Sequence, residues 1–485
     1  MKIKTCILIT FELLVVNVVF SANPLDVADS LYNLAYNYQE MGRYRDAEVL
    51  HIEALDIRLR YCDENSIEIS QSYRHIGNLY RDMGRYEEAE DYLKKAILSV
   101  SDSIEYAKSI ISYCSMLIEV NELRKVDSLI TKENVLICRV FGEESVRYAA
   151  WLRCKGNFYC EKGQLDSALV NYEKAQRIYE NVDNKQSLAS TYSNISDAYY
   201  DYGKYSQALD WSMKGLIARK ECFGSHSRPY ASSLAQCGLC YYKMSIYTEA
   251  ERDIMEAMKI YKEAVGENHP DYAKTLHYLA NIYQDQGQLS LALKFHTDAL
   301  KIMQNTFEEV HPNVLRSYNN LANLYRDLGN YQKSESLHLK VLQIRQQQFG
   351  ADNILCAKSL NNLGALYLDM GDYKKSKLMF AKAAKIFAKE LGEGNARYAT
   401  ALNNIANVFL HSNQLDSAQV TYEQIEHIFF MGFVDEEEKA FKAKLKEAVA
   451  SLNTNNFFNI ALVLWLSEKN RIYKTKKLQN FSRIP

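Results

Sequence analysis

The chain has 485 residues, of which 47% are hydrophobic and 24% charged, so it can bury a substantial core. Its net charge is −2, and because residues 469–485 carry six Lys or Arg and no acid, the body of the chain is acidic. An acidic surface repels phosphate backbones, so we expect no nucleic-acid partner.

Residues 1–22 have the layout of a secretory signal peptide. Lys2 and Lys4 precede the apolar run 6–20, and small residues follow at Ser21 and Ala22. Glu12 inside the run opposes this interpretation, and an uncleaved anchor or a wrongly assigned start is the alternative. We expect export, with no membrane span in the mature chain. The nine remaining cysteines follow helix faces, which predicts buried thiols in place of a disulfide framework.

Ten turn signals then divide the chain, and most successive signals are 42 residues apart. Glycine or asparagine suits a link between antiparallel helices, because that link often needs a left-handed backbone conformation. A constant period in this range indicates stacked repeats. The turn residues are Gly42, Gly84, Asn121, Gly163, Gly203, Ser245, Gly287, Gly329, Gly371 and Asn413.

Small residues flank these turns at fixed distances. Around Gly371, for example, Gly364 lies seven residues before the turn, Tyr367 four before and Ser376 five after. Small residues let two helix backbones approach, and the aromatic ring fills the space beside them. With these features, residues 27–430 resemble the tetratricopeptide repeat family. The 42-residue unit, with its LNNLA helices and HP links, is similar to the kinesin light chain type.

The resemblance implies an all-α fold, a right-handed superhelical α-solenoid of about ten helix–turn–helix repeats. The third repeat, 102–141, lacks the small and aromatic signature, and we interpret it as a degenerate unit that stays in the stack but bends or loosens it. Residues 431–466 are predicted to form a helical cap or linker. The basic tail 467–485 is predicted to be disordered.

The links between repeats contain two His-Pro pairs, at His269 and His311. Histidines one period apart could suggest a metal site, but repetition of a helix-capping motif explains them better. The sequence contains no phosphate-binding GxxxxGK[ST] loop, no HExxH, no GxSxG and no paired CxxC. We therefore expect no catalytic residues, no metal and no cofactor.

Polar residues on the first helix of each repeat are the candidate binding residues. In repeat eight, Asn319, Asn323, Arg326 and Asp327 share one helix face. A carboxamide both donates and accepts, so a ladder of asparagines can pair with the backbone of an extended peptide. The predicted peptide-binding set is Asn78, Arg81, Asn281, Asn319, Asn323, Arg326, Asn361, Asn403 and Asn407.

The resemblance to kinesin-light-chain-like proteins implies peptide clamping by Asn319, Asn361 and Asn403. The alternative is that these asparagines are solvated or hold neighbouring repeats together. Function is therefore expected to be that of an exported, non-enzymatic scaffold that binds a protein or peptide segment in a concave groove. Two alternatives stay open: the regulatory half of a truncated or split caspase-like protease, and a structural component of the cell envelope.

Overall fold

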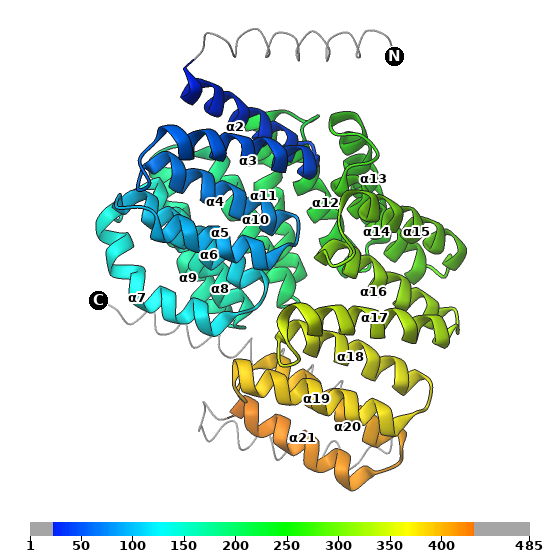
Figure 1. The fold of residues 1–485 in the computed structure, drawn as a ribbon. Helices are drawn as coiled ribbons and strands as arrows, with labels where there is room; N and C mark the ends of the chain where they lie inside the picture. Colours follow the sequence, from blue (N-terminus) through cyan, green and yellow to red (C-terminus); the bar gives the residue numbers. More distant parts are fainter. Residues whose placement is uncertain (1–22, 431–485) are drawn as a thin grey trace, which may run out of the picture.

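The computed structural model describes residues 23–430, and this part of the chain consists of twenty helices joined by short links, with no strands (Figure 1). The helices are α2 (Pro24–Glu40), α3 (Tyr44–Tyr61), α4 (Ile67–Asp82), α5 (Tyr86–Leu98), α6 (Ser103–Glu119), α7 (Leu123–Phe141), α8 (Val146–Glu161), α9 (Leu165–Asn181), α10 (Lys185–Asp201), α11 (Tyr205–Phe223), α12 (Arg228–Lys243), α13 (Tyr247–Ala264), α14 (Pro270–Asp285), α15 (Leu289–Thr306), α16 (Pro312–Asp327), α17 (Tyr331–Phe349), α18 (Ile354–Asp369), α19 (Tyr373–Leu391), α20 (Ala396–His411) and α21 (Leu415–Phe430).

Consecutive helices pair into ten repeats, from α2 with α3 to α20 with α21. The turn inside every repeat lies at the residue that the sequence predicted, and all ten turn residues have positive φ angles. Ser245, the one turn residue that is neither glycine nor asparagine, also has a positive φ, of 62°. The solenoid of helix–turn–helix repeats is thereby confirmed.

The small residues that flank the turns are buried where helices cross. Ala322 and Ser334 of repeat eight are both 0% exposed. In repeat nine the Ser376 hydroxyl donates a hydrogen bond of 2.7 Å to the Gly364 carbonyl, so the two helices approach to backbone contact distance. The aromatic residue four positions before the turn forms a hydrogen bond to the preceding repeat. The Tyr367 hydroxyl donates to the Glu335 carboxylate at 2.6 Å. The same bond joins Tyr80 to Glu48 at 2.9 Å.

The links between repeats end one helix and cap the next. His269 and His311 are N-cap residues, and the Nδ1 atom of each accepts a backbone N–H, from Asp271 and Asn313, at 3.1 Å. The capping interpretation of the His-Pro pairs is therefore confirmed. Asn353 and Asn395 cap α18 and α20 in the same way one and two repeats later.

The third repeat keeps its place in the stack as α6 and α7. The residues that replace its signature are buried, with Cys114 and Val126 at 0% exposure. The buried Glu133 accepts a hydrogen bond of 3.2 Å from Tyr106 and pairs with Lys132. Larger apolar residues thus fill the space that the usual small residue and ring would share.

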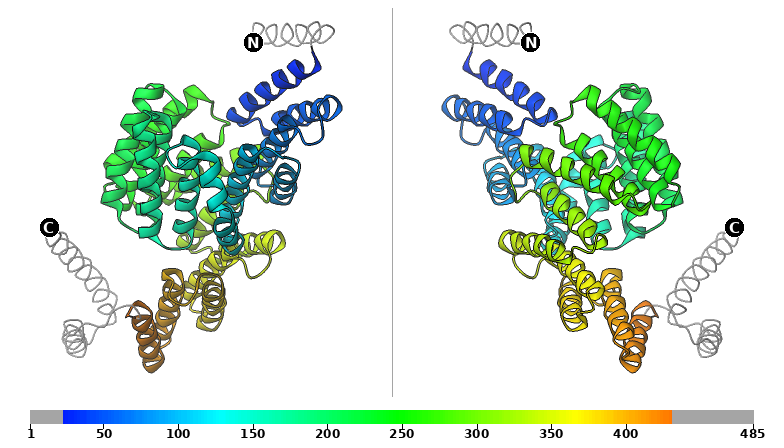
Figure 2. Two further views of the ribbon diagram at one scale, coloured as in Figure 1. Left: turned by 90° about the vertical axis from the view of Figure 1, so that its left-hand side faces the viewer. Right: turned by 90° about the vertical axis from the view of Figure 1, so that its right-hand side faces the viewer.

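The twenty helices form one superhelix that returns onto itself. Figures 1 and 2 show the early helices α2 to α7 beside the later helices from α14 onward. Three hydrogen bonds confirm this return, because they join residues separated by 229, 233 and 233 positions along the chain.

No helix between residues 23 and 430 is long and apolar enough to cross a membrane. All nine cysteines in this range are free thiols. Burial was predicted correctly for Cys114, Cys154, Cys237, Cys240 and Cys356, but Cys62, Cys138 and Cys160 are half-buried and Cys222 is exposed. The predicted signal peptide 1–22, the cap 431–466 and the tail 467–485 lie outside the described residues.

Candidate peptide-binding face

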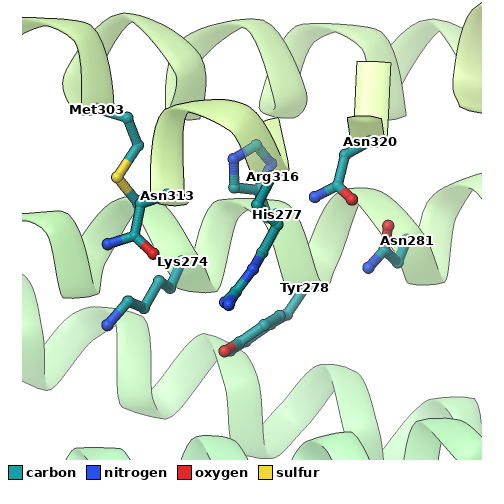
Figure 3. A pocket seen from close by; sticks show the side chains of 8 residues that line it. All are labelled: Lys274, His277, Tyr278, Asn281, Met303, Asn313, Arg316 and Asn320. Atoms are coloured by element: carbon teal, nitrogen blue, oxygen red, sulfur yellow. The ribbon is translucent and has the colours of Figure 1, made fainter. Parts of the chain in front are cut away.

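A small cavity lies between the first helices of repeats seven and eight, which are α14 and α16. Its volume is about 110 Å³. Figure 3 shows its lining, which α14, α15 and α16 supply. The lining residues are Lys274, His277, Tyr278, Asn281, Met303, Asn313, Arg316 and Asn320.

Helical spacing explains why these side chains meet. Lys274, Tyr278 and Asn281 follow one another by four and three residues, so they share one face of α14. Arg316 and Asn320 share the facing side of α16 in the same way. Helix α14 therefore presents Lys274 and Asn281, and α16 presents Arg316 and Asn320, on opposite sides of one narrow space.

The cavity is rich in hydrogen-bond donors. The Lys274 amine lies 3.0 Å from the Asp271 carboxylate, so its charge is partly compensated. Arg316 is exposed and forms no ion pair within the described chain. Three amides and the Tyr278 hydroxyl add neutral donors beside these charges. Such a set is suited to a carboxylate together with the carbonyl groups of a backbone.

A buried chain of hydrogen bonds forms the floor beneath the cavity. Ser317 donates its hydroxyl proton to the Asn313 carbonyl at 2.9 Å, so its oxygen must accept from Nε2–H of His277 at 2.6 Å. Nδ1 of His277 then accepts from Nδ1–H of His296 at 2.8 Å. Both imidazoles are thus neutral, in agreement with burial, which lowers the pKa of His296 to about 4 and that of His277 well below its ordinary value.

The predicted binding residues divide into three groups in the structure. In the first, Asn281 lines the cavity, and Asn323 lies three residues after Asn320 on the same face of α16. Neither amide is hydrogen-bonded to another side chain of residues 23–430. These two side chains are available to a ligand.

The side chains of the second group are bonded to a neighbouring helix, in the same repeat or in the next, or have a buried oxygen. The Asn319 oxygen accepts from Nδ1–H of His338, on the second helix of its own repeat, at 3.1 Å. The Asn407 oxygen accepts from the Tyr422 hydroxyl at 3.2 Å, and the Asn78 amide donates to Ser112 at 3.4 Å. The oxygens of Asn361 and Asn403 are buried without a hydrogen-bond partner in the described chain.

The third group consists of two arginines that form ion pairs within and between neighbouring repeats, near the turns. Arg326 lies 3.4 Å from Asp327 and 3.3 Å from Asp369 of the next repeat. Arg81 pairs with Asp82 at 2.8 Å and approaches Glu119 of the next repeat at 3.8 Å. Both arginines therefore already have acidic partners in this structure.

Sequence reasoning missed the residues that build most of the cavity: Lys274, Tyr278, Asn313, Arg316 and Asn320. The sequence contained a signal for two of them, because Asn320 and Arg316 lie three and seven residues before Asn323 and so share its helix face. The prediction instead followed Asn319 and its equivalents, one position away. A single position on an α-helix corresponds to a rotation of about 100°, which turns a side chain from the inner face to the neighbouring helix.

The sequence profile described as tetratricopeptide repeat matches residues 26–97, 147–221, 229–305 and 313–389, which together make more than half of the chain. The chain belongs to the tetratricopeptide repeat family. The matched ranges leave 98–146 out, and this range contains the third repeat. Among curated protein sequences none matches the chain.

Solved structures of tetratricopeptide proteins resemble the fold. A Rap protein complexed with competence and sporulation factor is 13% identical, with a TM-score of 0.52, over 83% of this chain and 97% of that one. BtubC from P. vanneervenii is 20% identical, with a TM-score of 0.37, over 46% of this chain and 88% of that one. A putative kinesin light chain from Podosopora anserina is 20% identical, with a TM-score of 0.33, over 41% of this chain and 95% of that one. Proteins built from such solenoids are interaction scaffolds.

Proposed function

We propose that this tetratricopeptide protein is a non-enzymatic scaffold that binds an extended polypeptide segment on the inner face of its solenoid. An acidic side chain or a C-terminal carboxylate of the ligand occupies the cavity between α14 and α16. The observation that carries the proposal is the convergence of Lys274, Arg316, Asn281 and Asn320 on one cavity, with Arg316 unpaired.

Each part of the cavity has a matching part in such a ligand. A carboxylate offers about four acceptor sites, and charge-assisted bonds from lysine and arginine to it are the strongest hydrogen bonds available to a peptide. Asn281, Asn320 and Asn323 can donate to and accept from the ligand backbone, which makes binding tolerant of side-chain identity. Asp327 and Asp369, the ion-pair partners of Arg326, lie farther along the same inner surface and disfavour further negative charge there.

The proposal is tested with an array of immobilised ten-residue peptides, each present with a free and with an amidated C-terminus. We expect the labelled full chain to prefer acidic peptides, and to release them as salt is raised because salt screens exposed charges. Preference for the free C-terminus would identify the terminal carboxylate as the group bound, and equal binding of both forms would identify a side chain. Preference for basic or purely apolar peptides would overturn the proposal.

Substitution of Arg316 links this binding to the cavity. Arg316→Gln keeps a hydrogen-bonding side chain but removes the charge, and the loss of a charged hydrogen bond weakens affinity roughly tenfold or more. The matched control is Lys382→Gln, the same loss of charge at an exposed lysine of α19, on the second helix of repeat nine. Equal affinities of the two variants would show that the ligand lies elsewhere.

Export is proposed on the N-terminal pattern alone. Lys2 and Lys4, the apolar run and the small residues before position 23 support cleavage near residue 22. N-terminal sequencing of the protein purified from its native host is expected to start near Asn23. A start at Met1 would contradict export by cleavage.

A further inference from the structure

Four contacts of one kind join the first half of the superhelix to the second, and we call them the seam. In each, the turn of an early repeat meets the N-cap residue six repeats later. The pairs are Gly42 with His269, Gly84 with His311, Asn121 with Asn353, and Gly163 with Asn395. Figures 1 and 2 show the early helices lying against the later ones along this line.

The N-cap side chain has two functions in the seam. His311 accepts the Asn313 N–H through Nδ1 and donates Nε2–H to the Asp82 carbonyl at 3.1 Å. Asn353 and Asn395 cap through their oxygens and donate through their nitrogens, to the carbonyls of Val120 and Lys162, both at 2.9 Å. One side chain thus caps its own helix and binds the turn across the seam.

Charge and aromatic contacts reinforce these hydrogen bonds. Arg228 pairs with Glu40 at 2.8 Å, and Arg397 pairs with Glu161 at 3.1 Å. Arg124 pairs with Glu390 at 3.4 Å. The rings of Tyr44 and Phe307 lie 5.3 Å apart, and those of Tyr86 and Phe349 lie 5.7 Å apart.

The seam adds to the packing of the two helices within each repeat. A solenoid repeat is stabilised by its own two helices and its immediate neighbours, so contacts six repeats apart can break while every repeat stays folded. The seam contacts are hydrogen bonds to backbone carbonyls and part-exposed ion pairs, which are individually weak, together with ring contacts and a buried apolar cluster that contains residues of both halves, among them Tyr86 and Ile354. Such an interface can open as a unit without unfolding the chain.

The seam lies next to the proposed binding cavity. Arg316 follows the seam residue His311 on the same helix. Across the seam lies Glu119 of α6, where burial raises the carboxyl pKa and the positive charges of Arg81 and Arg316 oppose that effect. The charge of Arg316 thus acts on a side chain across the seam, which places the cavity beside the seam.

We propose that the seam is a reversible latch, which closes the superhelix across its inner face and opens to admit the ligand. The opening itself is a property of the chain, whereas its effect on binding rests on the proposed function. Opening exposes the cavity between α14 and α16.

The latch is tested with the triple variant His311→Ser, Asn353→Ser and Asn395→Ser. Serine keeps the cap, as Ser66, Ser145 and Ser227 do for α4, α8 and α12, but it is too short to bind the turn as well. We expect a larger radius of gyration in small-angle X-ray scattering of the full chain, with unchanged helix content by circular dichroism. Association with the tightest acidic peptide from the array is expected to accelerate severalfold.

The reverse triple variant, Ser66→Asn, Ser145→Asn and Ser227→Asn, is the control, because these caps face no turn. A radius of gyration that stays the same in the seam variant would overturn the latch, and so would opening without faster association. If neither protein binds any peptide, the proposed function fails, while the scattering result still decides whether the seam opens.

A glycine pair gives a second, independent test. Gly84 and Gly329 have nearly the same φ, 74° and 72°, so alanine strains both turns alike. A Cβ atom at Gly84 would lie 2.9 Å from Cδ2 of His311, whereas nothing lies within 4 Å of one at Gly329. Only Gly84→Ala should enlarge the radius of gyration. Equal scattering from the two variants would count against the latch.

Discussion

Acidification from pH 6.5 toward pH 4 is expected to lower the free energy of unfolding steeply, by about 1.4 kcal/mol per pH unit for each histidine that stays neutral in the folded chain. Burial lowers the pKa of His51, His269, His296, His311 and His338 to about 4 and the pKa of His75 to about 3. Urea denaturation at half-unit steps between pH 7.5 and pH 4.5 measures the effect.

The sign follows from the proton balance of the two states. In the unfolded chain a histidine binds its proton near pH 6.5, but in the folded chain these side chains stay neutral until about pH 4. Between these values the unfolded state holds more protons, so stability is complete above pH 6.5 and is lost as the pH falls. Asp197 acts in the opposite direction, because burial and the neighbouring Asp201 raise its pKa to about 7.

Geometry explains why the folded chain resists these protons. His277 already donates through Nε2 and accepts through Nδ1, so an added proton would break its bond to His296. His296 and His338 would have to take the proton on Nε2, which is buried without a partner in the described chain. A charge placed there would have no compensating group.

His311→Asn is the sharpest variant for this prediction. Asparagine performs the same cap and seam bond at positions 353 and 395, but it does not titrate. The variant should stay folded. The slope of its free energy of unfolding against pH should be smaller by the contribution of one proton, about 1.4 kcal/mol per pH unit. A flat stability profile between pH 6.5 and pH 5 would contradict the neutral network.

The second large effect is expected at Gly156, where α8 crosses α9. A Cβ atom there would lie 2.3 Å from Cε1 of Tyr172 and within 2.7 Å of two other ring atoms. The ring cannot move aside, because Tyr172 is 1% exposed and its hydroxyl donates to Asn157 at 2.7 Å. Gly156→Ala should therefore destabilise the chain by about 1–3 kcal/mol in urea denaturation, as overpacking of a core does.

Gly215→Ala provides the matched control, because Gly215 also lies inside a helix, α11. The nearest atom to a Cβ there is the Ala189 carbonyl oxygen at 3.6 Å, an ordinary contact. Alanine should then stabilise the helix by about 0.5–1 kcal/mol relative to glycine. If both substitutions stabilised the chain, the close crossing at Gly156 would be wrong.

The sequence was sufficient to predict the repeats because each turn residue has a local cause. Gly329 and Asn413 can adopt positive φ at low cost, and small residues such as Ala322 mark the helix crossings. The seam could not be predicted in this way. His311 and Asp82 are 229 residues apart, and their contact depends on the summed rotation of six repeats, which no local pattern encodes.

The same reasoning explains the partial prediction of the binding face. The polar stripe on α16 was visible, but Asn319 and Asn320 are adjacent and chemically identical, so sequence alone could not assign one to His338 and the other to the cavity. Arg326 looked available because its acidic partner Asp369 belongs to the next repeat. The cavity depends on two helices that are a full period apart.

Asn319 and Asn320 therefore provide the most direct test of the inner-face account. Titration calorimetry with the tightest array peptide is combined with thermal melting of Asn319→Ala and Asn320→Ala. We predict that Asn320→Ala weakens binding a few-fold without lowering the melting temperature, as expected for one lost hydrogen bond. Asn319→Ala should lower the melting temperature, since it leaves Nδ1 of His338 unpaired, and should keep the affinity. Full affinity in Asn320→Ala with loss of binding in Asn319→Ala would contradict the account.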